Sequence, residues 1–377
     1  MGVSTMTTNS ENNTVEGVTL VPEPTADLLN PRQQMDYSDY KAEFIRWLAN
    51  IGKDPQQAEG YAHDTVRRRA CDVDVFHRYV WDDLGEGYTT NPTHDQTDQY
   101  IQKLAYSDFS DSHRANITKS LKCYWRWQNN LYDPPINFST SETVRQQPRD
   151  YFTKDERKQI KQAALEYGTV PNYNSLTPDQ RQQWKLHLAQ RFRKPTSNIG
   201  PKDFEKANGF KIPSIVYTAL DAALRPIEVG RATTQWVDIE NAVLRIPKDE
   251  SSKNRDNWVV SLSTKTASML DRWIAERECY EKYDGTTALW LTRESKPYSS
   301  RSLKYLLEKL CETAEIDTTH RDLTWYAIRH STGHYMTQEG DIESAAQQLR
   351  HKSTETTRKY THPSAEDRRD ILKDIDE

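Results

Sequence analysis

The sequence predicts a mainly α-helical protein with a small antiparallel β-sheet, divided into two domains. Its 377 residues are enough for two domains of ~100–200 residues each. Apolar residues recur at helical spacing through much of the chain, whereas residues 242–262 alternate as a pair of short strands would. A stretch rich in proline and polar residues, 134–150, is typical of a linker. We therefore expect a helical domain over 35–133 and a mixed domain over 151–363.

The first 34 residues differ in composition from the rest of the chain. They are rich in Thr, Asn, Glu and Pro and contain little to bury, so we expect a disordered leader. Four helices are then predicted in the first domain, within residues 36–48, 65–81, 91–104 and 112–131. Several arginines lie among their apolar positions, which allows a basic face on this bundle.

Net charge argues at first against a nucleic-acid partner, because the whole chain carries −5. The acidic residues, however, concentrate at the two ends. Residues 1–34 and 364–377 each carry −3, which leaves +1 for the region between them. A mixed surface of this kind can still present a basic face.

Cysteine spacing and hydropathy exclude several classes of protein. The four cysteines are far apart and form no metal-binding pair, so we expect idle thiols in a reducing cytoplasm; they are Cys71, Cys123, Cys279 and Cys311. No segment approaches ~18 consecutive apolar residues, and the polar N-terminus lacks a signal-peptide core. We expect a cytoplasmic protein that needs no metal or cofactor and contacts no membrane.

The second domain begins with a clear helix start. Thr153 and Glu156 have the spacing of a capping box, and Thr177-Pro178 opens another helix. A buried helix is predicted to end in Leu224-Arg225, where Arg225 would lie inside an apolar helix with Glu228 one turn away to orient it. Further elements are expected as strands at 242–247, 257–262 and 287–292 and as a helix at 299–314.

Residues 324–362 carry the most informative pattern. Arg329 lies on an apolar, helical run, a second short helix ends at His351, and Tyr360 follows nine positions later. An arginine, a histidine and a late tyrosine on three helical pieces can converge on one phosphate. Tyrosine is a feasible nucleophile when its oxygen is aimed and the phosphate charge is neutralised.

Together these segments resemble the signature of the tyrosine recombinases, the phage integrase and Xer-like family. The matching pieces are Leu224-Arg225-Pro226-Ile227-Glu228-Val229, Tyr326-Ala327-Ile328-Arg329-His330, Leu349-Arg350-His351 and Tyr360. The resemblance covers roughly residues 36–375. It implies a helical core-binding (SAM-like) domain followed by a tyrosine-recombinase catalytic domain. Acidic composition would suit a high-salt cytoplasm, so we interpret the chain as an archaeal or archaeal-virus type.

Three features depart from the family pattern. Tyr326 stands where the family usually has histidine, and Arg350 stands where it usually has glycine. Residues 168–212 form a long connection that resembles an insertion, to which the sequence assigns no role.

The resemblance also implies roles for individual residues. Tyr360 would be the nucleophile, with Arg225 and Arg329 clamping the phosphate and His351 donating a hydrogen bond to it. Lys253, on the turn between two strands, would be the general acid, with Lys248 as the competing candidate. Supporting roles fall to Glu228, beside Arg225, and to His330, packed beside Arg329, while Tyr326 would donate a neutral hydrogen bond in place of histidine.

The function that the resemblance implies is site-specific DNA recombination through a 3′-phosphotyrosyl intermediate. Its partners would be double-stranded DNA sites and further copies of the chain in a tetramer. A tail helix within 364–377, with Ile371 and Leu372 on one side, would need a partner surface. Two alternatives stay open: a type IB topoisomerase, and a DNA-binding regulator with an impaired site.

Overall fold

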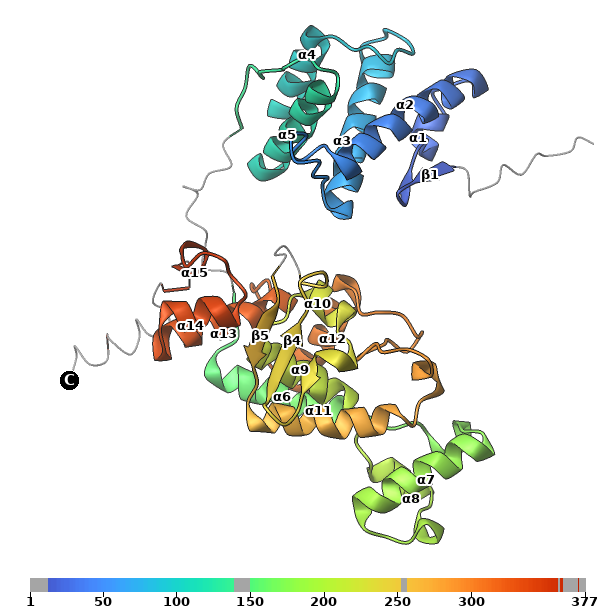
Figure 1. Cartoon of the computed structure of the whole chain (residues 1–377), viewed down its shortest axis with the longest axis vertical. Coiled ribbons are helices and arrows are strands. Elements are labelled where there is room, and N and C mark those ends of the chain that lie inside the picture. Colours follow the sequence, from blue (N-terminus) through green and yellow to red (C-terminus); the bar gives the residue numbers. More distant parts are fainter. Residues whose placement is uncertain (1–12, 139–149, 252–255, 359, 362–371, 373–377) are drawn as a thin grey trace, which may run out of the picture. The chain divides into compact units, whose positions relative to one another are not determined.

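The computed structural model describes residues 13–138, 150–251, 256–358, 360–361 and 372 (Figure 1). The chain divides into two compact units, Met1–Gln146 and Gln147–Glu377, each with its own hydrophobic core. The division falls inside the expected linker 134–150. The prediction of a mainly helical protein with a small antiparallel sheet is confirmed.

The first unit is a helical bundle preceded by a short hairpin. Its elements are β1 (Thr14–Val15), β2 (Val18–Thr19), α1 (Glu23–Ala26), α2 (Pro31–Asn50), α3 (His63–Arg78), a π-helical turn (Tyr79–Asp83), α4 (His94–Ala105) and α5 (Asp111–Trp127). Asn30 and Thr93 cap α2 and α4 with their side chains, which explains where these helices begin. The four predicted helices are present, although α5 ends before Leu131.

The expectation of a disordered leader is wrong for residues 13–34. Val18, Leu20 and Leu29 are buried in the core of the bundle, and the Asn13 side chain exchanges two hydrogen bonds with the backbone of Val21. These buried apolar residues pack the segment against the bundle, although its average composition is polar.

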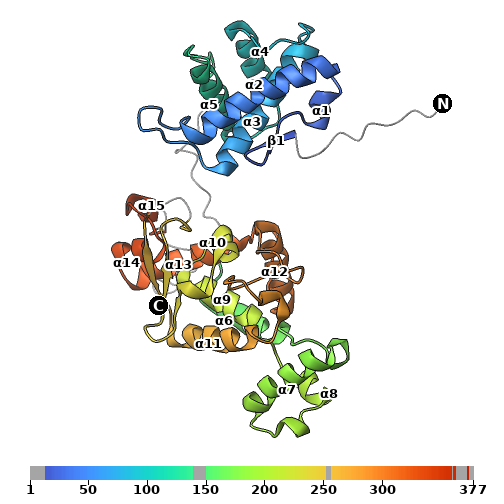
Figure 2. The ribbon, with the colours of Figure 1, turned by 45° about the vertical axis from the view of Figure 1, so that its right-hand side comes forward.

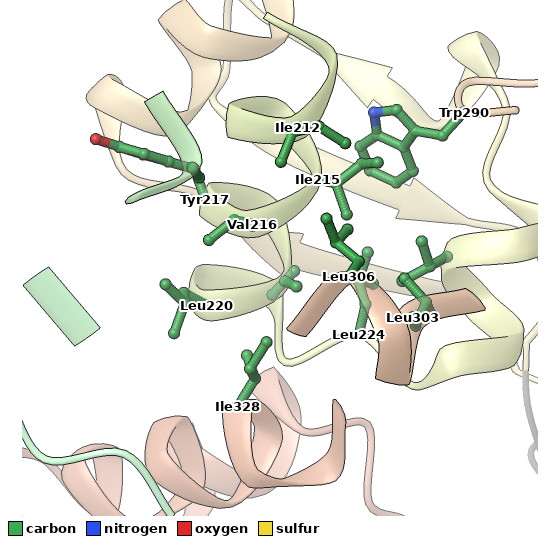
Figure 3. Packing of buried hydrophobic residues seen from close by; sticks show 14 of the residues in the cluster. Ile212, Ile215, Val216, Tyr217, Leu220, Leu224, Trp290, Leu303, Leu306 and Ile328 are labelled. Atoms are coloured by element: carbon green, nitrogen blue, oxygen red, sulfur yellow. The ribbon is translucent and has the colours of Figure 1, made fainter. Parts of the chain in front are cut away.

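The second unit packs helices around α9. Its helices are α6 (Lys154–Tyr167), α7 (Pro178–Phe192), α8 (Pro201–Lys206), α9 (Lys211–Ala222), α10 (Pro226–Arg231), α11 (Thr264–Arg277), α12 (Ser300–Thr313), α13 (Trp325–Glu339), α14 (Ile342–Gln348) and α15 (Glu355–Arg358). Nearly every residue of α9 is buried. Figure 3 shows Ile328 of α13 directed toward Leu220 of α9, with Leu306 of α12 near Leu224. This packing holds the C-terminal end of α9, where the α9–α10 junction begins, against α13.

A three-stranded antiparallel sheet lies in the same unit, in the order β3 (Val237–Asp238), β4 (Val243–Ile246) and β5 (Trp258–Ser261). The predicted hairpin of β4 and β5 is confirmed, with Leu244 opposite Val260. The third strand was predicted at 287–292, which is wrong. That segment makes isolated bridges at Ala288 and Leu291 and is apolar because it is buried in the core.

The connection at 168–212 forms a small helical lobe. It has its own hydrophobic cluster around Trp184, Leu188 and Phe204, which continues onto Cys279 after α11. In both views this lobe, α7 and α8, lies at the opposite end of the unit from α13–α15 (Figures 1 and 2). The expected tail helix lies outside the described residues except for Leu372. Among the described helices, none is both long and apolar enough to cross a membrane.

Candidate active site

Arg225 stands at the junction between two helices, not inside one as the sequence suggested. Helix α9 ends at Ala222, Ala223 adopts a left-handed φ of 49°, and Arg225 is extended with φ −70° and ψ 154°. Pro226 explains the break, because proline disfavours helical backbone in the preceding residue and is well suited to the first position of α10. The arginine is nevertheless almost fully buried.

The Glu228 carboxylate organises this junction. Its Oε2 accepts the backbone N–H of Arg225 at 2.8 Å, and its Oε1 accepts the Arg225 Nη1–H at 2.9 Å. Arg350 donates to the same two oxygens, from Nη2 at 2.6 Å and from Nε at 3.3 Å. Burial alone would raise the pKa of Glu228, but the guanidiniums of Arg350 and Arg225 outweigh it and lower the pKa to about 2. Glu228 is therefore an ionised, fully buried anchor.

Arg329 comes from α13 and reaches the same junction from the other side. Its Nη1 donates to the Ala223 carbonyl at 2.7 Å, and its Nη2 donates to the Leu349 carbonyl and to His351 Nε2, the latter at 3.1 Å. Burial, together with the neighbouring Arg225 and Arg350, lowers the pKa of Arg329 to about 9. A nearby anion would stabilise the charged form of a guanidinium that is buried in this way.

The hydrogen bonds of His351 define its tautomer. A guanidinium has no acceptor atom, so His351 Nε2 accepts from Arg329 and is unprotonated. Its Nδ1–H then donates to Thr357 Oγ1 at 2.9 Å. Thr357 lies on α15, and this bond ties the end of α14 to the segment that carries Tyr360.

Tyr360 is docked on α13 with its hydroxyl on a histidine. Tyr360 Oη lies 3.0 Å from His330 Nδ1, and both side chains are largely buried. The tyrosine ring is stacked on His351 with centroids 6.2 Å apart. Gly333 allows this approach, because a Cβ at that position would lie 3.1 Å from ring atoms of Tyr360. The Tyr360 ring therefore has a defined position, in which its hydroxyl oxygen faces Nδ1 of His330.

The structure thus brings together six of the eight residues singled out from the sequence. These six are Arg225, Glu228, Arg329, His330, His351 and Tyr360. Tyr326 lies at the edge, 39% exposed, with its ring 6.3 Å from that of His330. Lys253 lies outside the described residues. Its competitor Lys248 is exposed after β4, where its backbone N–H donates to Asn257.

Sequence reasoning missed two relationships in this site. His330 was expected to pack beside Arg329, whereas it contacts the Tyr360 hydroxyl. Arg350 was seen only as a departure from glycine, whereas its guanidinium is fully buried on Glu228. No local pattern indicated this ion pair, because Arg350 lies in the polar stretch Gln347-Gln348-Leu349-Arg350-His351-Lys352.

The charges of this cluster are unbalanced. Among the residues that the structure describes, Arg225, Arg329 and Arg350 gather around one buried carboxylate, that of Glu228. An excess of positive charge next to a seated tyrosine favours an anionic group such as a phosphate.

Comparison with known proteins gives a family match for the region that holds this cluster. The model of the phage integrase family matches residues 202–367. Tyrosine recombinase XerC of Actinobacillus pleuropneumoniae is 27% identical over 111 residues, which are 29% of this chain and 35% of that protein. Tyrosine recombinase XerC of Treponema denticola is 29% identical over 86 residues, 22% of this chain and 27% of that protein. The chain thus matches about a third or less of the length of these relatives.

Solved structures share the fold over most of the chain. XerH site-specific recombinase, in a post-cleavage complex with a palindromic difH substrate, has a TM-score of 0.54 at 13% identity and covers 93% of this chain and 91% of its own. The Tn1549 transposon integrase, in complex with transposon right-end DNA, has a TM-score of 0.50 at 16% identity and covers 89% of this chain and all (100%) of its own. The tyrosine and the arginines of this site all lie within residues 202–367, the part of the chain that matches the phage integrase family.

Proposed function

We propose that this protein is a site-specific DNA recombinase that cuts and rejoins DNA through a 3′-phosphotyrosyl intermediate. The observation that carries the proposal is the placement of Tyr360 Oη on His330, beside a buried cluster with excess positive charge. The XerC relatives and the DNA complexes of XerH and the Tn1549 integrase support the same conclusion.

In the proposed cleavage step, Tyr360 Oη forms a bond to a backbone phosphorus and the bond from phosphorus to the 5′-oxygen breaks. The phosphate remains a diester, now joined to Tyr360 and to the 3′-oxygen, so no external energy source is required. The tyrosine proton passes to His330, which lies within hydrogen-bond reach. A 5′-hydroxyl from another strand reverses the step and joins the exchanged strands.

Arg225 and Arg329 neutralise the non-bridging oxygens of the phosphate in this proposal. Guanidiniums suit the task because they are planar and permanently charged. His351 gives a further hydrogen bond once the phosphate displaces its present partners. Lys253 supplies the proton for the leaving 5′-oxygen, and Tyr326 donates a neutral hydrogen bond from the edge of the site.

The proposed partners are double-stranded DNA and three further copies of this chain. Strand exchange needs two duplexes with two cleavage sites each, so we propose a tetramer on two DNA sites. Removing residues 364–377 should leave single-site binding intact but abolish pairing of two sites, as measured by sedimentation of protein–DNA complexes. Unimpaired recombination by the shortened protein would contradict this part of the proposal.

The central test is covalent trapping on nicked suicide duplexes drawn from DNA that flanks the gene. A protein–DNA adduct that survives denaturation and maps to Tyr360 is the expected result. Recombination between two matched sites separates this function from that of a topoisomerase, which would relax supercoiled plasmids without joining partners. Binding without an adduct would instead support a regulator with an impaired site.

A further inference from the structure

Arg350 adopts a backbone conformation that arginine rarely takes. It follows the end of α14 with a left-handed φ of 56°, a region that favours glycine because a Cβ crowds the following carbonyl. Its guanidinium nevertheless turns into the protein and is fully buried. The interactions of this side chain must therefore compensate both for the backbone conformation and for the loss of hydration.

These interactions tie the end of α14 to the α9–α10 junction. Arg350 Nη1 donates to the carbonyls of Ala222 and Gln348 at 2.7 and 3.0 Å, and Nη2 donates to the Ala223 carbonyl at 3.0 Å. Nη2 and Nε also donate to the two oxygens of Glu228, at 2.6 and 3.3 Å. One side chain thus bridges two segments that each carry a phosphate-binding candidate.

Both phosphate-binding arginines depend on groups that Arg350 holds. Arg225 donates to the same Glu228 carboxylate, from its backbone N–H and from Nη1. Arg329 donates to the same Ala223 carbonyl, at 2.7 Å. Arg350 therefore shares one hydrogen-bond acceptor with each of these two arginines. Its own guanidinium is too buried to reach DNA.

The shared carboxylate also affects charge. A buried Arg225–Glu228 pair alone would be neutral, whereas the Arg225–Glu228–Arg350 triad keeps one positive charge. Glu228 cannot then cancel the charge that Arg225 offers to a phosphate.

We propose that Arg350 is a positioning residue for DNA cleavage, which acts through Glu228 and the Ala223 carbonyl to hold Arg225 and Arg329 in phosphate-binding geometry. The inference rests on the proposed cleavage function. It predicts that loss of the Arg350 guanidinium slows cleavage without weakening the binding of a DNA site.

A pH profile distinguishes this role from a general effect on folding. The charged groups that act on Glu228 are Arg225 before α10, Arg350 after α14 and Arg329 on α13. Removing Arg350 leaves the buried carboxyl with less positive charge, so its pKa rises from about 2 toward the ordinary range or above it. Protonated Glu228 no longer holds Arg225 firmly, so the defect should grow as pH falls.

The experiment measures single-turnover cleavage of a saturating suicide duplex by full-length protein. Arg350→Met keeps the length of the side chain, Arg350→Gly suits the backbone, and Arg350→Lys restores one charge. Arg193→Gly is the matched control, since this exposed arginine also has a left-handed φ, 52°, but lies after α7 in the helical lobe. We expect cleavage to fall about 10- to 100-fold for Met and Gly and to recover in part for Lys, with site affinity within about threefold of the parent.

Three comparisons decide the outcome. The ratio of the parent rate to the Arg350→Met rate should rise as the pH is lowered from about 7.5 to about 5. The loss in the double variant Glu228→Gln with Arg350→Met should be clearly smaller than the product of the two single losses, because the two residues act in part through one contact. Parallel pH profiles, additive losses, or rates within about twofold of the parent for Met and Gly would overturn the positioning role. If Arg350→Met does not fold, the Lys and Gly variants decide on the same measures. Absence of any adduct from the parent would reject the cleavage function itself, which is a separate failure.

Discussion

The Tyr360 hydroxyl lies 3.0 Å from Nδ1 of His330, and both side chains are largely buried on α13. Thirty residues separate them in the chain, so the contact depends on the seat that Gly333 and His351 provide for the tyrosine ring. An imidazole at this distance can aim the phenol and take its proton as the bond to phosphorus forms. In the proposed reaction, this pair both positions the nucleophile and accepts its proton.

His330→Phe should slow adduct formation by about 10²-fold, because a phenyl ring still fills the position but has no nitrogen to accept the proton. The measurement is the single-turnover rate on a saturating suicide duplex, with affinity for the site measured in parallel. His187→Phe on α7 is the matched control, since that histidine lies in the helical lobe. A rate for His330→Phe equal to that of the control would mean that the histidine only packs against the tyrosine.

Tyr360→Phe should abolish the covalent adduct while leaving the fold and DNA binding intact. The ring keeps its stacking on His351, and only the hydroxyl is lost. Tyr305→Phe on α12 is the control, because that tyrosine is exposed and lies outside the site. Peptide mapping should place the adduct of the parent on Tyr360, and an adduct on Tyr326 or Tyr335 would refute the assignment.

Several local features of the second unit follow from sequence pattern. The capping box of Thr153 and Glu156 was predicted with its hydrogen bonds, and the proline at the start of α7 was predicted as the first helical residue. The spacing of Arg225 and Glu228 likewise anticipated their ion pair, although Arg225 stands just before α10 and Glu228 is its third residue, so the contact is that of a capping box. Local rules succeed where both partners lie within one turn.

Relationships between distant segments did not follow from pattern. The seat of Tyr360 on His330 requires the chain after α15 to return to α13, which no periodicity encodes. The bond of Arg350 to Glu228 joins residues 122 positions apart in the chain. The burial of Val18 and Leu20 was also missed, because the average composition of a segment does not show which few apolar residues pack against the core.

Arg225→Ala and Arg329→Ala should bind a DNA site but lose cleavage by at least ~100-fold, since each guanidinium stabilises charge in the transition state. Arg329 also holds the Ala223 and Leu349 carbonyls, so its loss should lower thermal stability as well. Arg329→Lys separates the two effects, because an ammonium keeps the positive charge but lacks the planar guanidinium and its several N–H donors. Arg231→Ala, on the exposed end of α10, is the matched control. Cleavage that falls only in proportion to stability would indicate a structural role.

Acid stability should depend on Glu228. Its pKa in the folded protein, about 2, lies below the ordinary 4.5, so the ionised form is favoured by folding. The resulting stabilisation is present above about pH 4.5 and is lost as pH falls toward about 2. A shift of this size corresponds to about 3 kcal/mol near neutral pH. Urea unfolding should show that the difference between parent and Glu228→Gln narrows over this acidic range.

Glu205→Gln on α8 is the control for that measurement, because Glu205 is exposed and distant from the arginine cluster. Its stability should follow that of the parent at every pH. A difference between parent and Glu228→Gln that stays constant from neutral to acidic pH would contradict the ionised anchor and would indicate a packing effect.

Tyr326→Phe tests whether the edge of the site takes part in the chemistry. Tyr326 is 39% exposed and its ring lies near His330, so its hydroxyl can meet a phosphate that approaches from solution. A neutral hydrogen bond to developing charge contributes roughly 1.5–3 kcal/mol, or about 10- to 100-fold in rate. We expect a loss in that range for single-turnover cleavage, with unchanged affinity for the site. Tyr305→Phe again serves as the control. A cleavage rate for Tyr326→Phe within about twofold of the rate for Tyr305→Phe would assign the phosphate contacts to the arginines and His351 alone.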